Sequence, residues 1–197
     1  MESAASPPLR WLALPTAAAL FVLGVWVAGG VITDSFRASM ALVALWYALA
    51  GAAALAVGLR RRALRAPLWT GYAVAAVAVG GFLAWTTLRD RVVHERLTVG
   101  VTLARGRFTS GEHTTRGVAA IVRARDGRRF VTLRGFDTSP GPDLRVRVTP
   151  GNVDLGALKG NRGNQQYELP PGRDVAKVVI WCRAFSAEFG SAELTPA

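Results

Sequence analysis

The chain divides into an apolar N-terminal part and a more polar C-terminal part. Three apolar runs span Trp11–Thr33, Ala38–Leu59 and Pro67–Leu88, and each is 22 or 23 residues long. None of them contains Asp, Glu, Lys, Arg or His. About 20 apolar residues in a helix cross a hydrocarbon core about 30 Å thick. The pattern therefore predicts three transmembrane helices in a membrane region of residues 1–88.

The lack of ionisable side chains limits what this membrane region does. A membrane haem usually needs axial histidines, and ion or proton paths need acids or bases within the bilayer. The histidines, His94 and His113, both follow the third run. We therefore expect an anchor or packing surface rather than a transporter or a membrane cytochrome. The first run is longer than a typical signal-peptide core, which favours an uncleaved helix.

Arginines predict the orientation of a multi-pass protein in the cell membrane. Four of them crowd the link between the second and third runs: Arg60, Arg61, Arg62 and Arg65. The positive-inside rule places such a link in the cytoplasm. Other arginines flank the opposite ends of the helices in similar number, but long domains are translocated largely regardless of charge. We expect a cytoplasmic N-terminus and an extracytoplasmic C-terminal domain.

After a predicted stem over residues 89–103, the pattern is that of β-strands. Leu144, Val146 and Val148 alternate with polar residues, which is typical of a half-buried strand. The segment Val175–Cys182 is the most apolar, and we expect it to be the central strand. Gly and Pro interrupt the chain at short intervals. Residues 104–197 are therefore predicted to form an all-β domain, an antiparallel sandwich or barrel.

Charge and motifs exclude several functions. The formal net charge is +11, but the basic residues are interleaved with acids and no nucleic-acid-binding motif accompanies them. We expect no nucleic-acid partner. The chain has no Gly-x-Ser-x-Gly, His-Glu-x-x-His, P-loop or dinucleotide-binding motif. Whether the protein is an enzyme stays open.

Cys182 is the single cysteine, so a disulfide within the chain is impossible. The thiol is then a small buried hydrophobe, a reactive redox group or a link to a second chain. On a strand, Cys182 shares a face with Val178 and Ile180, while Trp181 and Arg183 share the other face. Burial would make the thiol inert, whereas the neighbouring Arg183 could lower its pKa and make it reactive.

Five further residues are candidates for a cofactor-binding site: His113, Asp143, Asn161, Gln165 and Trp181. His113 could ligate a haem or metal, but without a second histidine at a useful spacing a loop role is favoured. Asp143 and the amides are common turn residues, and Trp181 on a strand is most often a packing residue. A noncovalent haem or metal stays open, with no motif for it, and we predict no metal-ligand set.

An ordered series of short motifs in the C-terminal domain resembles a known family. It comprises FTSGEHTTRG at Phe108–Gly117, GPDL at Gly141–Leu144, LKGN at Leu158–Asn161, GNQ at Gly163–Gln165, VIWC at Val179–Cys182, and then Phe185, Phe189-Gly190, Ala192 and Leu194. Together these resemble the DM-thirteen (electron-transfer DM) domain over about residues 104–195. The membrane region has no such resemblance.

The resemblance implies a compact, mostly extracellular β domain similar to the DOMON-like sandwiches. It also implies a role in electron transfer, with Cys182 as the redox group. The first hypothesis is therefore a membrane-anchored extracytoplasmic redox domain that contacts membrane lipid and a redox or envelope protein partner. The alternatives are a non-catalytic binding or adhesion module with a structural cysteine, and a pair of chains linked through Cys182.

Overall fold

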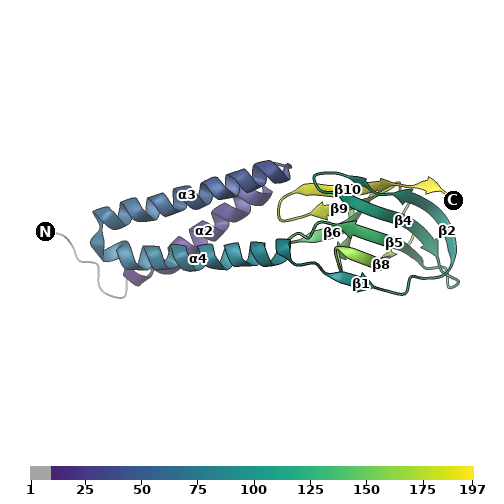
Figure 1. Cartoon of the computed structure of the whole chain (residues 1–197), viewed down its shortest axis with the longest axis horizontal. Coiled ribbons are helices and arrows are strands. Elements are labelled where there is room, and N and C mark those ends of the chain that lie inside the picture. The colour runs from purple at the N-terminus through teal and green to yellow at the C-terminus, as the bar shows by residue number, and fades with distance from the viewer. Residues whose placement is uncertain (1–9) are drawn as a thin grey trace. The chain divides into compact units, whose positions relative to one another are not determined.

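The computed structural model describes residues 10–197 and divides into two units, one ending at Ala84 and one spanning Trp85–Ala197 (Figure 1). The first unit is helical and the second is built almost wholly of β-strands. The predicted cytoplasmic N-terminus falls within residues 1–9, outside the described residues.

Three helices form the first unit: α2 (Ala13–Gly30), α3 (Phe36–Arg60) and α4 (Arg62–Leu88). Each is long and apolar enough to cross a membrane, as predicted. The third helix starts five residues before the predicted run, so that only Arg61 separates α3 from α4. The arginine cluster therefore sits on two helix ends and not on a separate loop.

Aromatic side chains join the helices to one another. The buried Phe21 ring lies 4.6 Å from the Tyr47 ring and 5.4 Å from the Tyr72 ring. The Tyr72 hydroxyl donates to the Tyr47 carbonyl at 3.0 Å, and the Trp46 indole donates to the Phe21 carbonyl at 2.9 Å. A polar group in lipid needs a partner within the protein, so these bonds also tie the helices together.

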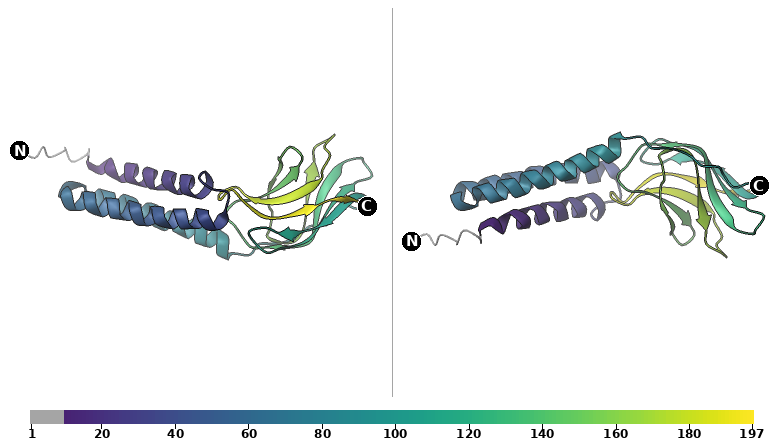
Figure 2. Two further views of the ribbon diagram at one scale, coloured as in Figure 1. Left: turned by 90° about the horizontal axis from the view of Figure 1, so that it is seen from above. Right: turned by 90° about the horizontal axis from the view of Figure 1, so that it is seen from below.

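The second unit is a sandwich of two sheets (Figures 1 and 2). The six-stranded sheet has the order β1-β8-β5-β4-β2-β11 and the five-stranded sheet β3-β10-β9-β6-β7. Their bounds are β1 Val92–His94, β2 Val101–Arg107, β3 Thr109–Ser110, β4 Thr115–Arg123, β5 Arg129–Thr138, β6 Leu144–Thr149, β7 Val153–Ala157, β8 Arg162–Leu169, β9 Lys177–Cys182, β10 Ala187–Glu193 and β11 Thr195–Pro196. All strand pairs are antiparallel except β1–β8. The sheets do not close into a barrel within residues 10–197, so the sandwich alternative is confirmed.

The predicted alternation decides which residues form the core. In β6, Leu144, Val146 and Val148 are buried while the residues between them are half-buried on the other face. The most apolar strand, β9, lies in the middle of the five-stranded sheet, between β10 and β6, as predicted. The inner faces of both sheets supply the buried side chains, which is the usual construction of a sandwich.

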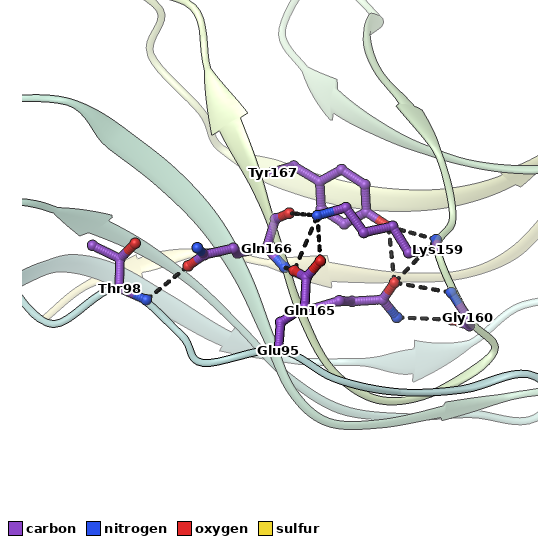
Figure 3. A network of polar contacts seen from close by, with 7 residues as sticks. All are labelled: Glu95, Thr98, Lys159, Gly160, Gln165, Gln166 and Tyr167. Atoms are coloured by element: carbon purple, nitrogen blue, oxygen red, sulfur yellow. Dashed lines mark hydrogen bonds and ion pairs between the residues drawn. The ribbon is translucent and has the colours of Figure 1, made fainter.

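Residues 91–98 are attached to the edge of the six-stranded sheet. Strand β1 pairs in parallel with β8, and the Cβ that a larger residue would place at Gly163 (φ +103°) would overlap the Val93 carbonyl. Beyond β1, Glu95 forms an ion pair with Lys159 at 2.7 Å and accepts a hydrogen bond from the Gln166 amide nitrogen at 2.9 Å (Figure 3). The segment that leaves the last helix is therefore part of the β fold.

Candidate functional site

Cys182 lies at one end of the sandwich, at the last residue of β9. It pairs with Leu144 on β6 and with Ala187 on β10, and its exposed fraction is 0%. It shares the inner face of the sheet with Val178 and Ile180, as the strand pattern predicted. A disulfide to a second copy would require this strand end to open, because the sulfur does not reach the surface.

The electrostatic environment keeps this thiol protonated. Burial raises the pKa of Cys182, and the negative charge of Asp143 adds to the increase. Hydrogen bonds from the backbone at Phe185, Asp143 and Ala184 favour the thiolate and offset the increase only in part. The thiolate is the nucleophile in thiol–disulfide exchange, so the folded domain holds the sulfur in its less reactive form.

Arg183 does not activate the thiol, contrary to one of the two expectations. Its guanidinium is directed to the Asp143 carboxylate, with Nε donating at 2.6 Å, and its backbone N–H donates to the Asp143 carbonyl at 2.9 Å. The side chain follows the outer, solvent-facing side of the strand, whereas the sulfur is on the inner side. The cation is thus paired with a carboxylate and does not lower the pKa of Cys182.

His113 packs on the other side of β10 from Cys182. Its ring stacks on Phe189 with 3.9 Å between centroids, and residues Gly111 and Glu112 hydrogen-bond to β10. Burial lowers the pKa of His113, and the charge of Glu112 opposes this change, so the ring is neutral at neutral pH. Because β10 separates His113 from Cys182, the two do not form a ligand pair. Within residues 10–197, no group of three His, Cys, Asp or Glu residues is placed to hold a metal ion.

The two candidate amides are used to fix the backbone. Asn161 accepts from the Arg91 N–H at 2.6 Å and donates to the Asp90 carboxylate and the Thr138 carbonyl. The fully buried Gln165 makes four bonds, to Lys159 N, to both the N–H and the C=O of Gly160, and to the Tyr167 hydroxyl (Figure 3). The amide is fully buried and its four bonds go to the Lys159–Gly160 loop and to Tyr167, so Gln165 shapes this loop.

The C-terminal β domain matches a known protein family. Residues 107–194 match the family model DM13, described as "Electron transfer DM13". The C-terminal β domain, which contains this match, is named the DM13 domain for that reason. The match confirms the resemblance and includes Cys182, Asp143 and His113. No curated protein and no solved structure gives a match.

Trp181 lies on the outer face of the DM13 domain, opposite the thiol. It is half-buried, and the Arg147 guanidinium covers its ring at 4.9 Å from the centroid. The ring is therefore packed against the five-stranded sheet from outside and does not fill the space between the sheets. Packing is the role expected for a tryptophan on a strand, and here the ring packs on the outer face of the sheet.

A cavity of about 180 Å³ lies next to the buried thiol. No motif in the sequence predicted this cavity. Its wall includes Asp143 and Asn161, together with Leu144, the residue paired with Cys182. Arg89, Arg91 and Trp85 complete it. In the sequence these arginines are indistinguishable from other charges that flank a membrane helix. Only the folding of residues 85–91 against the Gly141–Leu144 loop makes them part of a site.

Proposed function

We propose that the protein is a membrane-anchored, extracytoplasmic DM13 domain that acts in electron transfer through Cys182. The observation that carries the proposal is the match to the electron-transfer family over a segment whose single thiol lies in the core at one end of the sandwich. The three helices supply the anchor. The partner would be a redox protein that binds at this end of the domain.

The burial of the sulfur favours electron transfer over thiol–disulfide exchange. Exchange requires a thiolate that reaches a partner's sulfur, and both the burial and the raised pKa oppose it. In the alternative step, the thiol gives one electron to an oxidised one-electron centre of the partner protein. Its proton passes to a base of the partner protein, because the Asp143 carboxylate is already bonded to Arg183. A neutral sulfur radical remains, which one electron from a donor and the returning proton convert back to the thiol.

A substitution pair tests the redox role. We expect Cys182→Ala to abolish the transfer of electrons from isolated membranes to an added one-electron dye. Val178→Ala is the matched control, because Val178 is equally buried on the same face of the same strand and is not redox-active. Val178→Ala should retain dye reduction in proportion to the amount of folded protein.

Equal dye reduction in wild-type and Cys182→Ala membranes would sink the redox proposal. It would favour a non-catalytic binding module in which Cys182 only packs. The specific observation in favour of that second function is the complete burial of the thiol beside a cavity of ligand size. In that case, Cys182→Ala and Val178→Ala would both act only through stability.

The extracytoplasmic location is supported by the arginine cluster at the α3–α4 junction and by the odd number of helices. A single cysteine introduced into a Cys182→Ala chain tests it. Asp126→Cys, in the exposed β4–β5 turn, should react with a membrane-impermeant maleimide in intact cells. Arg61→Cys, at the helix junction, should react only after lysis. The reverse pattern would contradict the proposed topology.

A further inference from the structure

The cavity beside the Gly141–Leu144 loop carries uncompensated positive charge. Its two acidic neighbours are already paired: Asp143 with Arg183 at 2.6 Å, and Asp90 with Arg162 at 3.0 Å. Among residues 10–197, no carboxylate lies within ion-pair distance of Arg89 or Arg91. The cations of the wall are therefore available to an anion from outside the chain.

The other groups in the wall suit an amphiphilic ligand. The Arg89 guanidinium stacks on the Trp85 ring at 4.6 Å from the centroid, which leaves the N–H donors at its edge free to point to an oxyanion. Pro142, Leu144 and Leu158 line the cavity with apolar surface. The Arg89 guanidinium, with Arg91 and apolar side chains in the same wall, fits a phosphate joined to a hydrocarbon-bearing glycerol.

The sequence position of the cavity specifies where that ligand would come from. Helix α4 has 27 residues and is thus about 40 Å long, which exceeds a hydrocarbon core of about 30 Å. Trp85 lies in its last turn and Arg89 directly follows its last residue, and at such helix ends tryptophan and arginine meet lipid headgroups. A cationic cluster at this depth is attracted to anionic lipid.

We propose that this cavity binds the phosphate headgroup of an anionic phospholipid through Arg89 and Arg91, with Trp85 holding Arg89 in place. The site is independent of the electron-transfer proposal, since none of these three residues takes part in the chemistry at Cys182.

The test uses the full chain reconstituted in vesicles of equimolar phosphatidylglycerol and phosphatidylcholine, then released into detergent for native mass spectrometry. Wild-type protein is expected to retain a phosphatidylglycerol molecule. Arg89→Gln/Arg91→Gln should lower retention by about tenfold or more, because charge-assisted hydrogen bonds are lost. Arg96→Gln, which removes one positive charge from an exposed position outside the cavity, should retain the lipid.

Two controls separate binding from folding and from other anions. The Asn161 bond uses the Arg91 backbone N–H, so the double variant keeps it, and pulse labelling of Cys182 in urea should show an unchanged midpoint. Equal lipid retention in all three proteins, or equal loss in Arg96→Gln, would overturn the proposal. So would displacement of phosphatidylglycerol by inorganic phosphate at similar concentration, since the site would then bind free phosphate.

Discussion

Phe189→Ala is expected to lower the free energy of unfolding of the DM13 domain by about 3–5 kcal/mol, the usual cost of removing a fully buried aromatic ring. Phe189 has an exposed fraction of 0%, and its ring touches His113 on one side. A Cβ on Gly141 would come within 3.1 Å of the ring, so the other side is closely packed too. A loss of this size is a large part of the 5–15 kcal/mol that a typical domain has.

The single cysteine provides the measurement for Phe189→Ala. Because Cys182 is the one thiol and is sealed in the core, a pulse of maleimide at increasing urea labels the chain only when the DM13 domain opens. The helices do not contribute to this signal. Phe189→Leu is the control, since it keeps most of the volume and should cost less than about 1.5 kcal/mol. Equal urea midpoints for wild type and Phe189→Ala would show that the ring is not a core residue.

Gln165→Leu is expected to destabilise the domain by about 2–4 kcal/mol, although it replaces a polar residue in the core by an apolar one of similar size. The substitution leaves the Gly160 N–H and the Gly160 carbonyl buried without their partner and removes the acceptor of the Tyr167 hydroxyl, whereas the Lys159 N–H keeps its bond to that hydroxyl. An unsatisfied buried group costs about 1–3 kcal/mol, and the packing of one leucine side chain does not offset the loss of several hydrogen bonds. The same maleimide pulse measures the loss.

The neighbouring glutamine is the matched control for Gln165→Leu. Gln166 is half-buried and accepts one hydrogen bond, from the Thr98 N–H at 2.7 Å (Figure 3). Water can replace that bond, so Gln166→Leu should cost no more than about 1 kcal/mol. If both glutamine substitutions cost the same, the four-bond network around Gln165 does not stabilise the loop as its geometry indicates.

The burial of Cys182 argues against a role in thiol–disulfide exchange. An exchange-active cysteine is partly exposed and has a low pKa, whereas this sulfur is enclosed and its pKa is raised. The cavity lined by Leu144, the residue paired with Cys182, nevertheless lies within one strand of the sulfur. This cavity can hold a ligand. Both proposed functions, electron transfer and partner binding, use this end of the sandwich.

Much of the architecture followed from the sequence because it depends on local periodicity. Runs free of charge predicted α2, α3 and α4, and the alternation of Leu144, Val146 and Val148 predicted both β6 and its buried face. The position of Cys182 on the inner face of β9 followed from the same two-residue period. A single ordered series of motifs was enough to recognise the DM13 domain.

The site depended on contacts between residues that are far apart in the chain. The sequence by itself determined three apolar helices, an antiparallel β domain and one thiol on the strand face that it shares with Val178 and Ile180. Only the tertiary structure decided that Arg183 pairs with Asp143 instead of the thiol, and that Gln165 is consumed by its own loop. It also brought Arg89 and Arg91 beside the Gly141–Leu144 loop. Periodicity specifies which face of a strand a side chain lies on. Its contact partners depend on how strands far apart in the sequence pack, and those partners decide the charge, the pKa and the solvent access of the side chain.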